Sequence, residues 1–440
     1  MSLGKYVPTT TAEQQEMLAA IGVKSINDLY TQVPTNLRIE QLNIPSAKSE
    51  FEVRQHLTDL AAENKVFQSI FRGAGAYHHY IPALVKQIAS KEEFLTSYTP
   101  YQAEISQGVL QGIFEFQTMI CELTGLEAAN ASVYDGATAA AEAVNMTIER
   151  QRKKVFVAST VDPMTIETIR TYCEGQEIEL VMIPAKDGQV DQAVLKAKVD
   201  QETACLFIQQ PNYFGQIESA SELGDIIHEA KGKFIMGVNP IATTVLKTPA
   251  ECGADIATGE AQPLGLPLAF GGPYLGFMAT TKKMTRNLPG RIAGETVDSE
   301  GKRAFVLTLQ AREQHIRREK ASSNICSNQA HCALTASIYL SVMGPEGVKN
   351  AALQSYAKAH YLANELNSIP GFELVYTGEF FHEFLTRSPL PTTDLLHKLA
   401  EKGILGGYPV GNNILWCVTE MNTKKQMDDL INVIKEVVSA

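Results

Sequence analysis

The chain has 440 residues, enough for two or three domains with a large buried core. Its hydrophobic content of 45% is typical of a folded globular protein, and 49 acidic against 38 basic residues give a net charge of −11. An acidic protein repels phosphate backbones and anionic lipids, so neither a nucleic acid nor a membrane is an expected partner.

The sequence contains no targeting or metal-binding pattern. No run of about 18 apolar residues is long enough to span a membrane, and the N-terminal segment has neither a signal peptide's apolar core nor the character of a transit peptide. The seven cysteines include no C-x-x-C pair and mostly sit in apolar contexts, as expected in a reducing compartment. We therefore expect a soluble, cytoplasmic protein without a metal site.

Residues 8–95 are predicted to be mainly helical, with one irregular segment between the helices. This segment, residues 71–82, reads Phe-Arg-Gly-Ala-Gly-Ala-Tyr-His-His-Tyr-Ile-Pro. Its glycines forbid a regular element, and its aromatic and imidazole side chains are dense for a loop, which makes it a candidate site. The alternative is an aromatic plug between helices.

A polar stretch, residues 98–108 (Tyr-Thr-Pro-Tyr-Gln-Ala-Glu-Ile-Ser-Gln-Gly), leads into a long amphipathic helix. Apolar residues then recur every three or four positions up to Leu123. Pro100 suits the first turn of this helix.

From about residue 130 to 280 the pattern indicates alternating strands and helices. Val- and Ile-rich runs occur at residues 155–158, 180–183, 205–209 and 234–238, with helical stretches between them. Such buried strands predict a mainly parallel sheet. After residue 345 a compact α+β module follows. We predict a helical arm at 1–95, a large α/β domain at 96–345 and a small C-terminal domain at 346–440.

A glycine turn enters an alanine-rich helix at Asp135-Gly-Ala-Thr138. The free N–H groups and the dipole of such a helix start bind anions, often a phosphate. Asp135 and Thr138 are equally good capping residues, so a simple helix cap remains an alternative.

The segment from Asp255 to Gly276 resembles the frame of a cofactor site that lacks its nucleophile. In a large class of α/β enzymes, a Gly- and Pro-rich loop of this kind carries the lysine that forms a Schiff base with pyridoxal phosphate. Here Gln262 and Pro263 stand in its place. A mid-sheet strand usually offers an aspartate to the ring nitrogen, whereas the best-placed strand ends in Asn239. Lys247, Lys282 and Lys283 are rival lysines whose polar or loop neighbours suggest surface positions.

Residues 307–326 hold the densest cluster of charge, a basic patch on an acidic chain. It could be a salt-bridged helix, with Glu313 and Arg317 as an i, i+4 pair. Alternatively, it faces an interface or a bound anion. The candidates for that role are Arg312, Arg317, Arg318 and Asn324.

Four stretches together resemble the glycine dehydrogenase (decarboxylating) family, the P-protein of the glycine cleavage system. They are residues 98–108, residues 129–142 (Ala-Asn-Ala-Ser-Val-Tyr-Asp-Gly-Ala-Thr-Ala-Ala-Ala-Glu), residues 270–277 (Phe-Gly-Gly-Pro-Tyr-Leu-Gly-Phe), and residues 290–294 together with 309–326. The similarity extends over nearly the whole chain and is to the N-terminal half of the double-length protein, or to subunit 1 where the enzyme is split.

The resemblance implies an aspartate aminotransferase-like fold and a reaction shared with a partner. Glycine would be decarboxylated on pyridoxal phosphate, and the aminomethyl group passed to the lipoyl arm of the H-protein. The partner, subunit 2, would carry the Schiff-base lysine and bind most of the cofactor in an α₂β₂ assembly. Gln262 and Asn239 would then mark this chain as the half without the lysine, with no covalently held cofactor.

In this interpretation the chain would supply residues at the edge of the partner's pocket. The candidates are Tyr98, Thr99, Tyr101, Gln102 and Glu104, with Tyr77 and His78 nearby. There they could exclude water and position the lipoyl sulfur. The family's common Gly-Tyr-Tyr loop reads Gly-Ala-Tyr-His-His-Tyr over residues 75–80 here, a departure that bears on Tyr77 and His78.

Two alternatives stay open at this point. The chain could be a self-sufficient pyridoxal phosphate lyase or aminotransferase that uses an unexpected lysine such as Lys247. It could also be a non-catalytic scaffold of the same fold.

Overall fold

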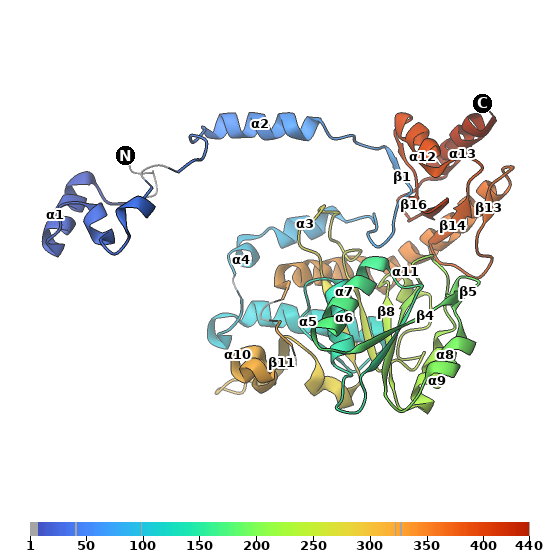
Figure 1. Cartoon of the computed structure of the whole chain (residues 1–440), viewed down its shortest axis with the longest axis horizontal. Helices are drawn as coiled ribbons and strands as arrows, with labels where there is room; N and C mark the ends of the chain where they lie inside the picture. The colour runs from blue at the N-terminus through green and yellow to red at the C-terminus, as the bar shows by residue number, and fades with distance from the viewer. Residues whose placement is uncertain (1–7, 40–41, 98, 322, 326–327, 440) are drawn as a thin grey trace. The chain divides into compact units, whose positions relative to one another are not determined.

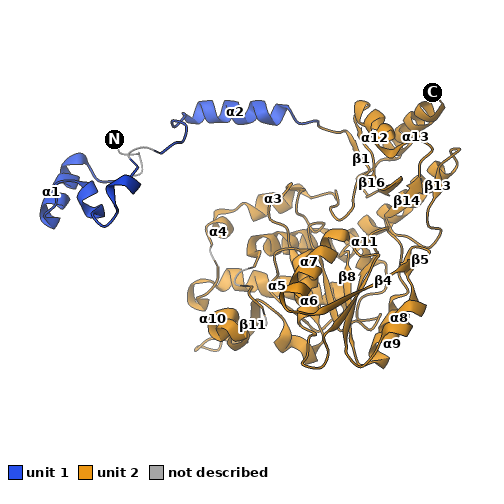
Figure 2. Cartoon of the chain, in the orientation of Figure 1, with its two compact units in different colours: residues 1–65 blue, residues 66–440 orange. Residues whose placement is uncertain are grey.

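The computed structural model describes residues 8–39, 42–97, 99–321, 323–325 and 328–439. The chain forms two compact units, residues 1–65 and residues 66–440 (Figure 2).

In its described residues, 8–39 and 42–65, the first unit has two α-helices and two short 3₁₀ turns, at α1 (Thr11–Ile21), η1 (Ile26–Tyr30), η2 (Thr35–Leu37) and α2 (Glu50–Ala62). Each α-helix starts with a capping box, formed by Thr10 and by Ser49. Among the described residues of this unit, only Leu18 is buried. The apolar side chains of Phe51 and Leu57 are 77% and 57% exposed, so the unit carries apolar surface without a core of its own.

The second unit is built on a seven-stranded sheet in the order β2-β10-β9-β8-β7-β3-β4. Strands β9, β8, β7, β3 and β4 run parallel, and β10 pairs antiparallel with β9 and β2. This confirms the predicted α/β class with a mainly parallel sheet. The strands are β2 (Ala128–Ala129), β3 (Lys154–Ala158), β4 (Glu179–Ile183), β7 (Thr203–Gln210), β8 (Lys233–Val238), β9 (Ile256–Glu260) and β10 (Gly276–Thr280).

Helices pack on this sheet, as Figure 1 shows. Helix α6 lies beside α7 and against β9 and β10, while α9 contacts β7 and β8. Alanines make up half of α6 and those at 139–141 and 143 are buried, which lets the helix approach the strands closely. The helices and 3₁₀ turns of this part are α3 (Ala83–Ala89), α4 (Glu92–Leu95), η3 (Ala103–Ile105), α5 (Gln107–Thr124), α6 (Gly136–Asn145), α7 (Pro163–Gly175), α8 (Gln192–Lys198), α9 (Ala220–Glu229), η4 (Ala242–Thr244) and η5 (Lys282–Asn287).

The long helix predicted from the polar stretch begins later than expected. Pro100 was placed in its first turn, but α5 starts at Gln107, after the 3₁₀ turn η3. Ser106, with φ −122° and ψ 22°, has a non-helical backbone and separates the two. Residues 99–106 therefore form an irregular segment on the surface rather than the start of a helix.

A two-stranded ribbon and a set of short turns follow the sheet and were not predicted as strands. The ribbon pairs β11 (Ile292–Val297) with β12 (Arg303–Thr308) and packs on α5. The turns are η6 (Gln310–Arg312), α10 (Gln314–Arg317) and η7 (Arg318–Lys320). A smaller hairpin joins β5 (Ala185–Lys186) to β6 (Gln189–Val190).

The C-terminal part has its own sheet and core. Helix α11 (Ala330–Asn367) leads into it and is kinked at Gly344, where proline follows. Trp416, Phe384 and Leu430 are fully buried in this core. The sheet is antiparallel, in the order β13-β14-β17-β16, and the elements are β13 (Glu373–Leu374), β14 (Glu383–Arg387), α12 (Thr392–Glu401), β15 (Ile404–Leu405), β16 (Tyr408–Val410), β17 (Asn413–Cys417) and α13 (Lys424–Ser439).

The segment after Val66 is fastened to this C-terminal core. Strand β1 (Ser69–Ile70) pairs in parallel with β15, and the fully buried Phe71 belongs to the same apolar cluster as Trp416. The irregular segment 71–82 thus starts from a fixed point in the core.

Within the described residues, no helix is both long and apolar enough to cross a membrane. The six cysteines placed there are free, and no group of three or more His, Cys, Asp or Glu side chains in that part of the chain is arranged to hold a metal ion.

Candidate functional site

A cavity of about 450 Å³ opens where the central parallel strands end. Strands β7, β8 and β9 all contribute their carboxyl ends, and helices α6 and α7 begin there. Ligands of open α/β sheets bind at this edge, because the loops leave the strands there and the helix N-termini point toward it. The topology therefore makes this cavity the first candidate site.

Gln262 follows β9, at the position where a Schiff-base lysine was sought. Its side chain is 2% exposed and joins the loop 71–82: Tyr77 N–H donates to Oε1 at 3.0 Å, and Nε2 donates to Tyr77 O at 3.0 Å. Nε2 also donates to Leu266 O at 2.8 Å. The amide is fully engaged in bracing two loops, so this position is structural in the chain.

Asn239 follows the central strand β8 and lines the cavity. Its Oδ1 accepts hydrogen bonds from the N–H groups of Ile241 and Ala242 at 2.9 and 3.3 Å. Its Nδ2 is buried and has no hydrogen-bond partner among the residues that the structure describes. An amide here offers no negative charge to a pyridinium nitrogen.

The N-terminus of α6 already holds an anion of the chain's own. Gly136 N–H donates to Glu260 Oε2 at 2.9 Å, and the other oxygen of Glu260 accepts from the N–H groups of Gln262 and Leu275 at 2.9 and 3.0 Å. Burial raises the pKa of this carboxyl. Asp135 caps the same helix by accepting from Thr138 N–H at 2.7 Å. Asp135 therefore acts as a helix cap. The carboxyl group of Glu260 accepts from the Gly136 N–H, to which a phosphate could otherwise bind.

Pyridoxal phosphate does not fit these residues. The lysine position is a buried glutamine, the ring-nitrogen position is an amide, and the helix N-terminus is taken by Glu260. The three rival lysines, Lys247, Lys282 and Lys283, are exposed and outside the cavity lining.

A second carboxyl, Glu383 at the start of β14, borders the cavity from the C-terminal part. Tyr77 Oη donates to its Oε2 and Ala74 N–H to its Oε1, both at 2.7 Å. Burial raises the pKa of Glu383 to about 7. The neighbouring His382 is 2% exposed, and burial, together with His79, lowers its pKa well below the ordinary value.

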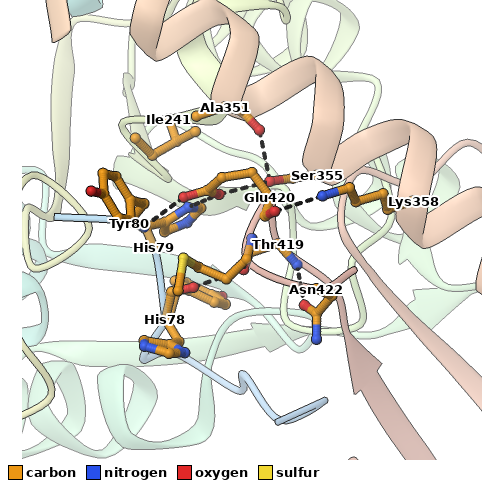
Figure 3. Close-up of polar contacts among 12 residues, drawn as sticks. His78, His79, Tyr80, Ile241, Ala351, Ser355, Lys358, Thr419, Glu420 and Asn422 are labelled. Carbon is orange, nitrogen blue, oxygen red and sulfur yellow. Dashed lines mark hydrogen bonds and ion pairs between the residues drawn. The ribbon is translucent and has the colours of Figure 1, made fainter. Parts of the chain in front are cut away.

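The loop 71–82 is held on its other side by Glu420, as Figure 3 shows. Glu420 bonds His79 Nδ1 at 2.7 Å and accepts from Tyr80 N–H at 2.6 Å, while Lys358 Nζ donates to its carbonyl. Burial acts to raise the pKa of Glu420, but the bonds from His79 and Tyr80 outweigh it and keep the pKa low. The side chain of His78 is exposed, and its carbonyl accepts from Thr419 Oγ1.

The predicted partner-facing stretch lies elsewhere on the surface. Tyr98 lies outside the described residues. Tyr101 is 54% exposed, and the guanidinium of the buried Arg291 sits 4.6 Å from its ring centroid. Gln102 and Glu104 are exposed. Thr99 lines a second cavity, of about 350 Å³. Tyr77 and Thr99 therefore border different cavities.

The basic stretch is less helical than expected. The predicted Glu313–Arg317 pair was wrong: α10 is a single turn with Glu313 as its N-cap, and that carboxylate lies 3.6 Å from His315 Nδ1 instead. Arg312 donates to the carbonyls of Leu288 and Gly290, and burial lowers its pKa, so this guanidinium is a structural brace.

The remaining candidates of this stretch are on the surface. Arg317 and Arg318 are exposed, and Arg318 has a positive φ of 57°. Asn324 is exposed beside a cavity of about 310 Å³ that Glu142 and Tyr172 also line.

Sequence reasoning missed Glu260, Glu383, His382 and Glu420. A signal existed for Glu260, because a carboxyl at the end of a buried strand is unusual and indicates the carboxyl edge of the sheet. The other three come from segments more than 110 residues further along the chain, and nothing in their local sequence indicates the pairing.

The fold and the cavity define the class: the chain has the architecture of the fold-type I enzymes that depend on pyridoxal phosphate. A C-DES mutant with glycine covalently linked to its pyridoxal phosphate aligns with a TM-score of 0.63 over 87% of this chain and 99% of that one, at 13% identity. A sphingosine-1-phosphate lyase from Burkholderia pseudomallei aligns with a TM-score of 0.65 over 92% and 93%, also at 13% identity. At such identities the likeness concerns the fold alone.

Closer relatives identify the family. The model of the glycine cleavage system P-protein family matches residues 4–434, and the chain belongs to this family. A probable glycine dehydrogenase (decarboxylating) subunit 1 from Moorella thermoacetica is 48% identical over 99% of this chain and 100% of its own. The crystal structure of an inhibitor-bound glycine decarboxylase P-protein aligns with a TM-score of 0.93 at 41% identity, over 98% of this chain and 99% of that one. The chain is accordingly one subunit of a P-protein enzyme.

We expect Gln262→Ala to lower the free energy of unfolding by about 3 kcal/mol. The change removes one buried and two partly buried hydrogen bonds, and it takes away the side-chain partner of both backbone groups of Tyr77. Denaturant unfolding of the full chain measures this, with the exposed Gln111→Ala on α5 as the control, expected to change stability by less than about 0.5 kcal/mol. Equal effects of the two changes would contradict the bracing role.

We expect Glu383 to make the chain less stable as the pH rises from about 4.5 to about 7. The folded protein keeps the carboxyl protonated up to about pH 7, whereas in the unfolded chain it ionises near the ordinary 4.5. The loss amounts to about 3 kcal/mol across this window. Unfolding curves over pH should show the full decrease for the wild type and for the exposed control Glu373→Gln. For Glu383→Gln the decrease should be smaller by about 3 kcal/mol, since Glu142, Glu218 and Glu260 still titrate with raised pKa. Parallel profiles for all three would refute the assignment.

Proposed function

We propose that this chain is the lysine-free subunit of a two-subunit glycine dehydrogenase. The partner, subunit 2, binds pyridoxal phosphate and carries its lysine, and the pair decarboxylates glycine and passes the aminomethyl group to lipoylated H-protein. The hydrogen bonds of Gln262 carry the proposal. At the position where a lysine would form the Schiff base, this side chain braces two loops instead. The proposed assembly is α₂β₂ and the proposed location is the cytoplasm, as the cysteine pattern suggests.

Two surfaces of the chain support a partner of this kind. The helical unit at residues 1–65 exposes apolar side chains that it does not bury itself, such as Phe51 and Leu57. Apolar surface of this extent is typical of protein–protein contact. In the second unit, the segment 99–106 exposes Tyr101 and the 80% exposed Ile105.

In the proposed assembly the cofactor supplies the electron sink for loss of the carboxyl group, and this chain completes the walls around it. Tyr101 would present its hydroxyl to the shared pocket, held by the buried guanidinium of Arg291 behind its ring. Gln102 and Glu104 would add polar groups at the same edge. Their contribution would be to exclude water and to orient the substrate and the lipoyl arm.

The self-sufficient enzyme is disfavoured by the positions of the lysines, since Lys247, Lys282 and Lys283 are exposed and outside the cavity. A scaffold without a catalytic role would leave the exposed aromatic and polar groups at 101–104 unused.

Glycine-dependent bicarbonate exchange tests the proposal. It is measured with lipoylated H-protein and pyridoxal phosphate, for this chain alone, for subunit 2 alone, and for both together. We expect exchange only in the mixture, because neither chain alone has the complete pocket. Exchange by this chain alone would overturn the proposal, and no exchange in a mixture shown to be assembled would favour the scaffold.

We expect Tyr101→Phe to lower turnover of the assembled enzyme by about tenfold or more, since it removes a hydroxyl from the pocket edge while keeping the ring over Arg291. Assembly, followed by size-exclusion chromatography, and thermal stability should stay unchanged. Tyr356→Phe, at a 39% exposed position on α11, is the matched control and should leave turnover unaltered. Loss of assembly in Tyr101→Phe would contradict this role and show instead that the hydroxyl stabilises the interface between the subunits.

A further inference from the structure

The ribbon β11–β12 packs on α5 and on η3, the 3₁₀ turn inside the surface segment 99–106. A small apolar core joins the ribbon to α5, made of Leu110, Ile113, Ala131, Ala293 and Phe305. The proposed function gives this ribbon no task, although two of the stretches that resemble the family, residues 290–294 and 309–326, begin and follow it. The ribbon therefore has a fixed place beside the segment that we propose to face the partner.

Two glutamines of α5 fasten the ribbon, one on each strand. Gln117 is 7% exposed; its Nε2 donates to Ala293 O and its Oε1 accepts from Ala293 N–H, both at 2.9 Å. Gln107 holds β12 in the same way, since its Nε2 donates to Phe305 O and its Oε1 accepts from Phe305 N–H, both at 2.8 Å. Hydrogen bonds in both directions fix the position of the ribbon along the helix.

Gln107 also holds the segment 99–106 itself. Its Nε2 donates to Ala103 O at 2.6 Å in addition to Phe305 O. Both N–H groups of the amide are thereby used, one on the segment and one on the ribbon. The backbone of η3, two residues after Tyr101, is thus tied to β12 through a single side chain.

Arg291, the residue before β11, contacts the same segment through a side chain. Its guanidinium carbon lies 4.6 Å from the centroid of the Tyr101 ring. The arginine is 4% exposed and the tyrosine 54%. A cation over an aromatic ring is attracted to it, and more strongly where water is excluded. One face of the Tyr101 ring is therefore held by a buried charge, while the residue keeps about half of its surface exposed.

The backbone that carries Arg291 is held in place as well. Ala131 N–H donates to Arg291 O at 2.8 Å, and Arg312 donates to Gly290 O at 2.7 Å. A counter-charge comes from Glu313, which is 7% exposed: burial raises the pKa of its carboxyl, and the guanidinium of Arg291 is the largest opposing influence. The guanidinium thus has a fixed anchor and a favourable electrostatic setting.

We propose that the ribbon β11–β12 is a positioning element, and that Gln107 and Arg291 are positioning residues that fix the orientation of Tyr101 in this chain before a partner binds. Gln107 sets the backbone beside Tyr101, and Arg291 sets its ring. The inference rests on the proposed function and deepens it, because it names the residues that keep this edge of the shared pocket in shape. An edge that is already ordered loses less conformational entropy on assembly.

The mobility of residue 101 in the purified full chain tests the orientation directly. Tyr101→Trp provides a fluorescent reporter, since Trp416 is the only natural tryptophan and is fully buried, and an indole suits a guanidinium at least as well as a phenol. In time-resolved anisotropy we expect Arg291→Met or Gln107→Leu, added to this variant, to raise the amplitude of fast local motion by about twofold or more. Arg387→Met, at an exposed position on β14, is the control and should leave it unchanged.

Circular dichroism and the melting temperature establish that each variant is folded. Arg291→Lys keeps the charge but lacks the planar guanidinium, so it should give an intermediate amplitude. It decides the role of the charge if Arg291→Met does not fold. Unchanged mobility in folded Gln107→Leu, or in the folded Arg291 variants, would overturn the proposal.

A double-mutant cycle in the assembled enzyme tests whether Arg291 acts through Tyr101. We expect Arg291→Met to lower turnover by about fivefold or more when Tyr101 is present, but by less than about twofold when Tyr101→Leu has removed the ring. Equal losses in both backgrounds would overturn the positioning role and leave Arg291 a general structural one. Absence of exchange in the wild-type mixture would count against the proposed function, whereas the mobility of residue 101 is measured without the partner.

Discussion

The amide of Gln262 ties the end of β9 to the loop 71–82 through hydrogen bonds in both directions, and the arrangement around the cavity depends on this tie. It fixes Tyr77, whose hydroxyl in turn meets Glu383 of the C-terminal sheet. One neutral side chain thereby connects three segments that are distant in the sequence. A lysine at the same place would put a charge where the backbone of Tyr77 needs both a donor and an acceptor.

The charges around the cavity also differ from those of a site for pyridoxal phosphate. Glu260 satisfies the N-terminus of α6 from within the chain, and Asn239 leaves the end of the central strand without a negative charge. An enzyme site for pyridoxal phosphate has the opposite distribution, with a phosphate at the helix and a carboxylate at the ring nitrogen. The chain has kept the fold of that class, with a different distribution of charge at the carboxyl ends of its central strands.

The sequence predicted the large-scale organisation well because buried parallel strands carry strong local signals. The Val- and Ile-rich runs matched β3, β4, β7 and β8, whereas the ribbon β11–β12 was missed because its exposed polar residues lack such a pattern. The absence of the lysine was evident from the sequence of one loop. The contacts made in its place could not be predicted, because the hydrogen-bonded pairs Gln262–Tyr77 and Tyr77–Glu383 are 185 and 306 residues apart in the sequence. Local sequence patterns do not indicate such contacts.

We expect no lysine of this chain to hold the cofactor, and borohydride reduction of the assembled enzyme followed by peptide mass spectrometry tests this expectation. Reduction fixes pyridoxal phosphate irreversibly on the lysine that carries it. We expect a modified lysine in the partner subunit and none in this chain. A stoichiometric pyridoxyl group on Lys247, or on any other lysine of this chain, would contradict it.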